Sequence, residues 1–407
     1  MPRKFIYILF SIALCIVFVF NANAEFVPVP LKNGKDVLPG AYQIQQYLPL
    51  LKGKKVALLI NQTSEIKGVS LLDTLLHRGV TIVKIFVPEH GFRGGAEAGE
   101  TINNDIDSTT NTPIVSLYGD NKKPKPEQLK DVDVLVYDLQ DVGCRFYTYI
   151  STMQYAMEAC AENKKEFIIL DRPNPNGHFV DGPVLKTEFK SFVGMQPVPI
   201  VYGMTVAEYA KMLIGEKWVK GTEKMKIKII PCLKYDHNTL YELPVRPSPN
   251  LKTFTAVLCY PSLCLFEGTI VSVGRGTEMP FQEWGHPNFA HKSIYSFRPV
   301  QVFGKPAPMY AFKDCYGQMV AMSRHEALQL MDRKIRLIWL VRAYEWALDS
   351  DKKVFFNPFF DKLAGTDELR KQIEAGKNED EIKATWQYDI AQFKKIRKKY
   401  LLYPDFE

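Results

Sequence analysis

The chain has 407 residues, a formal net charge of +7, 24% charged residues and 12% aromatic residues. This length suits two domains, because one domain typically holds about 100–200 residues. The composition is that of a globular protein, which excludes wholesale disorder and fibrous repeats. The excess of basic residues is small and no basic patch with interleaved aromatic residues is visible, so the sequence does not indicate nucleic-acid binding.

The first segment of the chain has the pattern of a secretory signal peptide. Arg3 and Lys4 precede an apolar run at 5–20, and the tripeptide 22–24, Ala-Asn-Ala, then supplies the small residues of a cleavage site. The alternative is a retained anchor, since the run is only slightly short of a bilayer span. We expect cleavage of residues 1–24, a secreted or periplasmic mature protein, and no membrane span in it.

Export would permit disulfides. Of the seven cysteines, all but the one in the apolar run remain in the mature chain, and none forms a C-x-x-C motif. A zinc ribbon or a thioredoxin-like site is therefore not indicated. We expect buried thiols, with Cys259 and Cys264 as the pair if any disulfide forms.

Five short apolar runs then predict β-strands, at 56–60, 82–87, 114–117, 132–137 and 167–170. An amphipathic helix is predicted after the first run, beginning at Ser70 as its cap and ending before Gly79. Helical spacing recurs at 149–162. Continuous apolar strands that alternate with helices indicate a parallel sheet covered on both faces.

The remaining chain predicts a second unit. Thr205 and Glu208 can form a capping box, which predicts a helix to about Trp218. The proline-containing segment 231–250 is predicted to be an extended connector. We therefore place the domain boundary near residue 250, giving domains at 25–250 and 251–407. The second domain is predicted to contain a strand at 255–260, a glycine-rich segment at 267–276 and charged helical sequence including 326–348.

Polar side chains follow each of the five predicted strands. In an open α/β sheet, ligands bind beyond the carboxyl ends of the strands. A polar loop after one strand is ordinary, but five segments rich in Asp, Glu, Asn and Gln favour a functional site at that edge. The segments are Asn61-Gln62-Thr63, Pro88-Glu89-His90-Gly91, Tyr118-Gly119, Asp138-Leu139-Gln140-Asp141 and Asp171-Arg172-Pro173-Asn174.

Several familiar motifs are missing from the sequence. There is no G-x-S-x-G, H-E-x-x-H or phosphate-binding loop, and the segment 274–276 lacks the third glycine of a dinucleotide site. The seven histidines show no metal-ligand spacing. We therefore expect neither a cofactor nor a metal. Ser64 and Lys67 match the S-x-x-K of penicillin-binding acyl enzymes, but the accompanying S-D-N and K-T-G motifs are missing.

Glu89 is the candidate general acid, because Phe86 and Phe92 would partly desolvate a carboxyl group that stands just beyond a strand. Asp138 and Asp171 end neighbouring strands and could supply the second carboxylate that glycoside hydrolysis usually requires. The alternative for all three acids is that they brace the loops. A pure sugar-binding protein could use amides and aromatics without the cost of burying charge, so the density of acids favours catalysis.

Arginine and aromatic residues complement these acids. A guanidinium group suits a substrate carboxylate, because its planar fork can donate two parallel hydrogen bonds. Aromatic side chains can form the wall on which a sugar ring packs, although an aromatic cluster is more often core. The candidates are Arg93, Arg145, Arg172 and Arg275, with Tyr118, Phe146, Tyr147 and Tyr149.

A series of long motifs in this chain resembles the bacterial exo-β-N-acetylmuramidase family, from about residue 56 to the C-terminus. The motifs are Asn61-Gln62-Thr63, Pro88-Glu89-His90-Gly91-Phe92-Arg93-Gly94, Ser116-Leu117-Tyr118-Gly119, Asp138-Leu139-Gln140-Asp141-Val142-Gly143, Arg145-Phe146-Tyr147-Thr148-Tyr149, Leu170-Asp171-Arg172-Pro173-Asn174-Pro175, Pro247-Ser248-Pro249-Asn250, Phe266-Glu267-Gly268-Thr269 and Gly274-Arg275-Gly276-Thr277. One departure is visible, because Gln282 stands where the family often has an acid, and Glu283 follows it.

The resemblance implies a Rossmann-like α/β domain with a parallel sheet, followed by a smaller C-terminal α/β domain, with an active-site cleft between them. It also implies release of N-acetylmuramic acid (MurNAc) from the non-reducing end of peptide-free peptidoglycan fragments. Glu89 would be the catalytic acid, and the lactyl carboxylate of MurNAc would be the target of an arginine. The partners would be saccharides of MurNAc and N-acetylglucosamine (GlcNAc).

We therefore predict a glycosidase with Glu89, Asp138 and Asp171 as catalytic candidates. The predicted substrate-binding residues are Asn61, His90, Arg93, Tyr118, Gln140, Asp141, Arg145, Tyr147, Arg172, Asn174, Asn250, Glu267 and Arg275. Asp141 and Glu267 are also candidates for the second carboxylate. The alternatives are a peptidoglycan amidase or esterase, which could use Ser64, and a non-catalytic muropeptide-binding protein. The sequence leaves open the stereochemistry and whether the chain forms a homodimer.

Overall fold

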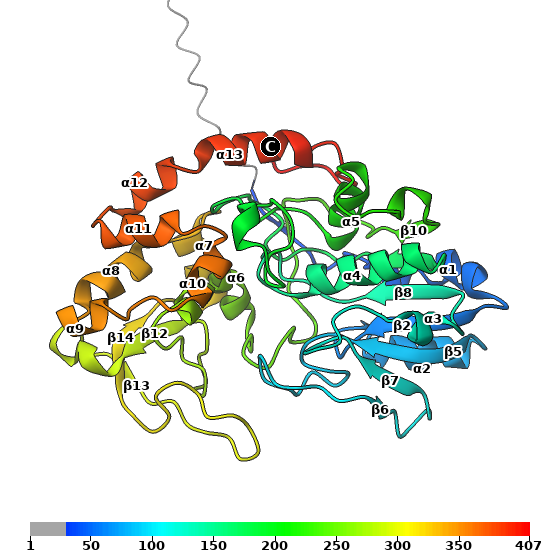
Figure 1. Cartoon of the computed structure of the whole chain (residues 1–407), viewed down its shortest axis with the longest axis horizontal. Coiled ribbons are helices and arrows are strands. Elements are labelled where there is room, and N and C mark those ends of the chain that lie inside the picture. The colour runs from blue at the N-terminus through cyan, green and yellow to red at the C-terminus, as the bar shows by residue number, and fades with distance from the viewer. Residues whose placement is uncertain (1–29) are drawn as a thin grey trace, which may run out of the picture.

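A computed structural model describes residues 30–407 of the chain, so the predicted signal peptide lies outside the described residues. The first half (residues 30–250) is built on a seven-stranded sheet (Figure 1). All neighbours in the sheet are parallel except the edge strand β6. In spatial order the strands are β10 (Ile227–Ile230), β9 (Glu166–Leu170), β8 (Val134–Asp138), β2 (Lys55–Ile60), β5 (Thr81–Val87), β7 (Pro113–Ser116) and β6 (Asp105–Ile106).

Each of the five predicted strands forms, and the predicted parallel sheet is confirmed. The central strand β2 explains why its apolar run is continuous. Ala57 and Leu59 pack into one hydrophobic cluster, whereas Leu58 and Ile60 pack into another on the opposite face. Successive side chains of a strand point to opposite faces, so a sheet that is covered on both faces needs apolar residues throughout. The edge strands β6 and β10 are additions to the predicted set.

Helices cover both faces of this sheet (Figure 1). Apolar residues of α4 (Tyr149–Glu162) and α5 (Val206–Gly215) belong to the cluster on one face, and those of α1 (Ile44–Leu51) and α2 (Leu71–His77) to the cluster on the other. The one-turn helix α3 (Pro126–Leu129) precedes β8. Both predicted caps form, since Ser70 accepts from the Leu72 amide and Thr205 pairs with Glu208 in a capping box.

Small strand pairs complete the first half. Strand β3 (Glu65–Ile66) pairs with β4 (Val69–Ser70) just before α2. Strand β1 (Lys32–Asn33) pairs in parallel with β11 (Thr239–Leu240), which lies within the predicted connector. Apart from this pair, the connector forms no regular strand or helix within the described chain.

The second half (residues 251–407) begins with a helix, α6 (Phe254–Leu263), so the prediction of a strand at 255–260 was wrong. Thr253 caps this helix by accepting from the Ala256 amide. The segment from Thr255 to Leu263 is buried all round, and a continuous apolar run does not distinguish a strand from a buried helix by its periodicity.

The rest of the second half combines a small antiparallel sheet with helices. The sheet has the order β12 (Glu283–His286), β14 (Cys315–Met319), β13 (Ser296–Phe297). The predicted helical segment 326–348 is two helices, because Asp332 and Arg333 have positive φ angles between them. The helices are α7 (Arg324–Met331), α8 (Ile338–Trp346), α9 (Asp349–Lys352), α10 (Phe359–Ala364), α11 (Glu368–Glu374), α12 (Glu379–Ala384) and α13 (Gln387–Arg397). The predicted α/β fold, with a smaller second α/β unit, is therefore confirmed.

The end of the chain returns to the first half, where α13 lies beside α5 (Figure 1). Tyr403 donates a hydrogen bond to Asp171, at the end of β9, and accepts one from the Cys232 amide. Arg397 donates to the Gly203 carbonyl and forms an ion pair with Asp405. The contacts of Tyr403 with Asp171 and of Arg397 with Gly203 therefore join the two halves.

Two further observations concern the described residues as a whole. No helix in residues 30–407 is long and apolar enough to cross a membrane. The six cysteines in this range are buried thiols, Cys259 and Cys264 included.

Candidate active site

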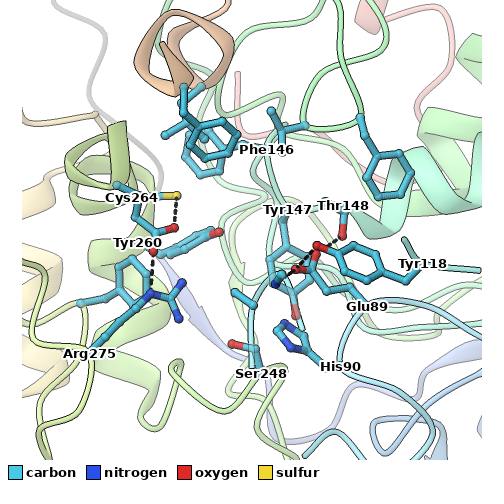
Figure 2. Close-up of a pocket in the computed structure, with 18 of the residues that line it drawn as sticks. Glu89, His90, Tyr118, Phe146, Tyr147, Thr148, Ser248, Tyr260, Cys264 and Arg275 are labelled. Carbon is cyan, nitrogen blue, oxygen red and sulfur yellow. Dashed lines mark hydrogen bonds and ion pairs between the residues drawn. The ribbon is translucent and has the colours of Figure 1, made fainter. Parts of the chain in front are cut away.

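A pocket of about 570 Å³ lies where the carboxyl ends of β5 and β7 face the second half of the chain. This volume is in the range of about 300–1,000 Å³ that is usual for small-molecule sites. The side chains that line it come from both halves (Figure 2). They are Glu89, His90, Ala98, Gly99, Tyr118, Gly119, Lys122, Phe146, Tyr147, Thr148, Phe192, Val193 and Ser248, with Tyr260, Cys264, Glu267, Arg275, Phe281, Phe359 and Leu363.

Glu89 is held in this pocket by three hydrogen-bond donors. Its Oε1 accepts from the Tyr118 hydroxyl at 2.9 Å and from the Gly99 amide at 3.2 Å, and its Oε2 accepts from the Thr148 hydroxyl at 2.8 Å (Figure 2). A hydroxyl group can donate to a carboxylate or accept from a carboxylic acid. Both protonation states of Glu89 can therefore keep the same position, which suits a group that gives up a proton and recovers it.

The backbone after β5 turns sharply to present this carboxyl group. His90 has a φ of 73° and Gly91 a φ of 74°, both in the left-handed region. A histidine in this region is uncommon and strained, so the surrounding structure has to maintain it. The sequence Glu-His-Gly thus places Glu89 at the pocket wall while the chain bends away.

His90 is buried next to Glu89, and its Nδ1 lies 2.7 Å from the Ala96 carbonyl oxygen. Burial lowers the pKa of His90, although the neighbouring Glu89 carboxylate opposes this effect. The neutral ring must carry its hydrogen on Nδ1, because a carbonyl oxygen can only accept. Its Nε2 is therefore an acceptor, available to a substrate hydroxyl.

Glu267 and Arg275 form an ion pair in the same pocket, with Arg275 Nε 2.6 Å from Glu267 Oε1. The guanidinium group also lies over the Phe281 ring, 5.1 Å from its centroid. Its two terminal nitrogens point toward the space between this pair and Glu89 (Figure 2). Since Nε is already bonded, the terminal nitrogens are oriented to receive an anionic group of a ligand.

Aromatic rings enclose the pocket. The Tyr118 and Phe192 rings lie 6.3 Å apart, and the Lys122 ammonium lies 5.2 Å from the Phe192 centroid. The Tyr260 ring packs edge-on against Phe146 at 5.4 Å and against Phe281 at 5.0 Å. Such walls provide flat apolar surfaces for a sugar ring, while the acids and Arg275 provide its polar partners.

Asp138 and Asp171 do not line the pocket, so its walls give no support to the catalytic role predicted for them. Asp138 is fully buried and forms a two-point ion pair with Arg172, at 2.5 Å to Nε and 2.9 Å to Nη2. Asp171 is also fully buried and accepts from Thr205, from the Ala207 amide and from Tyr403. Their oxygens are directed into the protein, so both acids brace the sheet edge beneath the site.

The structure brings some predicted binding residues together and leaves others out. Besides Glu89, the pocket wall contains His90, Tyr118, Tyr147, Glu267 and Arg275, and Asn250 lines an adjoining pocket. The other predicted binding residues lie outside the walls of both pockets. They are Asn61, Arg93, Gln140, Asp141, Arg145, Arg172 and Asn174.

Two of the predicted arginines are engaged elsewhere. Arg93 is 73% exposed and pairs with Asp107. Arg145 is buried, and its terminal nitrogens donate to four backbone carbonyls, at Pro183, Val198, Leu363 and Ala364. Neither guanidinium group faces the pocket, so neither can receive a ligand carboxylate there.

The predicted amides and Asp141 stabilise loops. Asn61 donates to the Tyr149 hydroxyl, and Gln140 donates to the Asp141 and Pro173 carbonyls. Asn174 donates to the Met204 carbonyl. Burial raises the pKa of Asp141 to about 6, although a hydrogen bond from Tyr202 opposes the shift.

Three other residues singled out by the sequence are also occupied. The Ser64 hydroxyl is buried and donates to the Asp138 carbonyl. Gln282 is buried between Thr253 and the Ala321 carbonyl, and Glu283 accepts from Thr277 and Tyr295. None of the three lines the pocket.

Several residues that line the pocket were not among those predicted from the sequence. Thr148 lies within the aromatic motif at 145–149, next to predicted residues, so its position was a usable signal. Lys122 and Phe192 lie in loops without a motif, and Tyr260 and Phe359 reach the pocket from the second half. In residues 30–407, no cluster of three or more His, Cys, Asp or Glu side chains could hold a metal ion.

Comparisons with known proteins cover nearly the whole chain. The N-terminal model of the exo-β-N-acetylmuramidase NamZ family matches residues 56–255, and the C-terminal model matches residues 258–403. The chain is 36% identical over 388 residues to the peptidoglycan β-N-acetylmuramidase NamZ of Bacillus subtilis. The matched region covers 92% of this chain and 91% of that protein.

Two solved structures are also similar. A DUF1343 family protein from Bacteroides fragilis has a TM-score of 0.83 and 46% identity, covering 91% of this chain and 99% of its own. A second DUF1343 family protein from the same species has a TM-score of 0.69 and 29% identity, covering 90% of this chain and 99% of its own.

Proposed function

The chain belongs to the exo-β-N-acetylmuramidase NamZ family, and from this premise we propose that its pocket releases MurNAc from the non-reducing ends of peptide-free peptidoglycan fragments. It is a glycoside hydrolase that acts on peptidoglycan. The assignment of this pocket as the active site rests on Glu89. Its carboxyl group lies in the pocket and has two hydroxyl partners, which suit both of its protonation states.

Glu89 acts as the general acid in this proposal. It transfers a proton to the glycosidic oxygen while the bond between that oxygen and C1 of MurNAc breaks. The oxygen of a water molecule ends on C1, and its proton is taken up by a carboxylate, so the products are MurNAc and a shortened saccharide. Of the residues that line the pocket, Glu267 is the other carboxylate, which supports it as the second catalytic group.

The position of Glu267 is compatible with two roles. As a base it would activate water directly, and the product would have the inverted configuration. As a nucleophile it would first bond to C1, and the configuration would be retained. Carboxyl groups lie about 5–5.5 Å apart in retaining enzymes and about 6.5–9.5 Å apart in inverting ones. Proton NMR of the first-formed anomer decides between the two roles.

Arg275 supports recognition of MurNAc in particular. MurNAc differs from GlcNAc by a lactyl ether, which carries a carboxylate. Among the four predicted arginines, Arg275 is the one that lines the pocket, and Glu267 holds its Nε so that the terminal nitrogens face inward. A guanidinium fork held in this way can donate two hydrogen bonds to the lactyl carboxylate.

The two alternatives have less support. An amidase or esterase based on Ser64 would need an accessible nucleophile, but this hydroxyl is buried and bonded to a carbonyl. A non-catalytic binding protein would have no need of a carboxyl group held between two hydroxyls. Export also belongs to the proposal, supported by the signal-peptide pattern of residues 1–24 and by the location of peptidoglycan outside the cytoplasm.

The test is to incubate the purified mature chain with the disaccharide MurNAc-β-1,4-GlcNAc and to analyse the products by mass spectrometry. The proposal predicts free MurNAc and free GlcNAc. Release of acetate with an intact glycosidic bond would favour an esterase or amidase. An untouched disaccharide that nevertheless binds in calorimetry would favour the binding protein.

A further inference from the structure

A second, smaller pocket of about 250 Å³ adjoins the first, and the two share Ala98, Glu267 and Arg275. We propose that it is the subsite for the leaving sugar, and that it binds the GlcNAc residue attached to the scissile bond. The inference rests on the proposed function.

The position of Glu89 relative to this pocket supports the assignment. A general acid must lie beside the oxygen that connects the two sugars. The Gly99 amide donates to Glu89 Oε1 at 3.2 Å, and the preceding Ala98 lines both pockets. The short segment 97–99 therefore leads from the acid into the second pocket. A saccharide with MurNAc in the first pocket can place its glycosidic oxygen beside Glu89 and its next sugar in the second pocket.

The walls of the second pocket match the chemistry of an N-acetylhexosamine. Asn250 Nδ2 donates to Glu97 Oε2 at 2.6 Å, which places an amide and a carboxylate together on one side. Val300, Pro308 and Met309 offer apolar surface in the same pocket. GlcNAc has hydroxyl groups for the polar side, and it has an acetamide methyl and ring C–H groups for the apolar side.

Lys305 lines this pocket and connects the two halves of the protein beside it. Its ammonium donates to the Gly95 carbonyl and lies 3.4 Å from Glu100 Oε2, both in the segment that follows Glu89. At the other end of the same loop, the Val300 amide donates to the Gly276 carbonyl at 2.9 Å. The subsite is therefore complete only while the loop of the second half is attached to the first half.

The test compares two substrates on the mature chain. One is MurNAc-β-1,4-GlcNAc, and the other is 4-nitrophenyl β-MurNAc, whose aryl group offers neither hydroxyl nor acetamide to the subsite. The variants are Lys305→Met, which keeps an apolar stem but removes the bridge, and Asn250→Ala, which removes the amide. Lys353→Met is the matched control, because Lys353 is an exposed lysine of the second half that lines neither pocket.

We expect the ratio of kcat/KM for the disaccharide to kcat/KM for the aryl substrate to fall about tenfold in both variants, the size of effect that follows from one lost hydrogen bond. The ratio should be unchanged in Lys353→Met. Inhibition of aryl-substrate cleavage by free GlcNAc should weaken in parallel.

An unchanged ratio in folded Lys305→Met and Asn250→Ala proteins, with unaltered inhibition by GlcNAc, would overturn the subsite. An equal loss on both substrates would also overturn it, because the residues would then act on the first pocket. If the unmodified protein cleaves neither substrate, the proposed function itself fails, and this inference fails with it.

Discussion

The Thr148 hydroxyl donates a hydrogen bond of 2.8 Å to Glu89 Oε2. Thr148 immediately precedes α4, and Glu89 lies just beyond β5, after Pro88, so this contact joins two elements that are separate in the sequence. The hydroxyl makes no capping bond to the helix, which leaves Glu89 as its side-chain partner. Tyr118, after β7, holds the other oxygen of the same carboxyl group.

Removing either hydroxyl should slow catalysis without unfolding the protein. Thr148→Val and Tyr118→Phe each delete one partner of Glu89 and keep nearly the same volume. We expect kcat on MurNAc-GlcNAc to fall about tenfold in each, since a hydrogen bond to a charged group contributes about 1.5–3 kcal/mol. Tyr155→Phe is the control, because Tyr155 stacks on Phe192 but does not line the pocket. An unaltered kcat in both variants would contradict the positioning role.

Arg275 should determine the preference for MurNAc over GlcNAc at the cleaved position. We expect Arg275→Met to raise KM for 4-nitrophenyl β-MurNAc about tenfold or more, with little effect on the corresponding GlcNAc glycoside, because the lost partner is the lactyl carboxylate. Arg93→Met is a matched control, since Arg93 is exposed and pairs with Asp107. Equal losses on both glycosides would assign Arg275 a general role in place of recognition of the carboxylate.

Arg145 should be a major contributor to stability. Its guanidinium donates to Pro183 and Val198 in the first half and to Leu363 and Ala364 in the second. Arg145→Met would leave these buried carbonyls unsatisfied, so we expect the free energy of unfolding in urea to fall by about 3 kcal/mol or more.

Arg298→Met provides the control for this measurement. Arg298 forms an exposed ion pair with Asp314, and solvent screens such pairs so that they contribute little to stability. If Arg145→Met destabilises the protein no more than Arg298→Met does, the four carbonyl contacts are not a significant connection between the halves.

Asp171 should make stability depend on pH. Burial raises its pKa to about 7, although the hydrogen bond from Tyr403 opposes the shift, and an unfolded aspartate has a pKa of about 3.9. Between these values the folded state holds a proton that the unfolded state has lost. The contribution is therefore fully present below about pH 4 and is lost as the pH rises through 7.

The measurement compares the unmodified protein with Asp171→Asn in thermal or urea unfolding at several pH values. The variant does not titrate at this position, so other groups cancel in the difference. We expect the stability of the unmodified protein relative to the variant to fall by on the order of 4 kcal/mol between pH 4 and pH 8. A difference that does not change with pH would show that Asp171 is ionised throughout.

Much of the first-half fold could be predicted because its physical signal is local. The runs that form β2, β8 and β9 are almost wholly apolar, as strands covered on both faces must be. The caps of α2 and α5 are also local, since Ser70 and Thr205 bond within three residues. Helix α6 could not be predicted in this way, because a buried helix and a buried strand have the same apolar composition.

The site was only partly predictable, because its composition depends on distant partners. From the sequence alone, Glu89, Asp138 and Asp171 all lie at strand ends, and nothing local distinguishes the one that lines the pocket. Asp138 is neutralised by Arg172, 34 residues later, and Asp171 binds Tyr403, 232 residues later. No periodicity or local motif reveals such pairs. Glu89 follows β5, which lies nearer the β6 edge of the sheet than β8 and β9 do, and it is the acid of these three that lines the pocket.

The pocket residues of the second half follow the same principle. Tyr260 reaches the pocket from α6, and Phe359 from α10, through packing between the two halves. Neither helix carries a local sequence motif that would mark it as part of a site. By contrast, Glu267 and Arg275 stand in glycine-containing segments, where polar residues are a more specific signal.

The most direct test of the account is the rate at which Glu89→Gln cleaves MurNAc-GlcNAc, with Glu127→Gln, an exposed glutamate of α3, as the control. General-acid catalysis contributes about 10²–10⁴-fold, so we expect a loss of that size from a folded Glu89→Gln protein and none from the control. A dinitrophenyl β-MurNAc, whose leaving group needs little protonation, should lose much less. A folded Glu89→Gln protein that cleaves the disaccharide at nearly the unmodified rate would contradict the account.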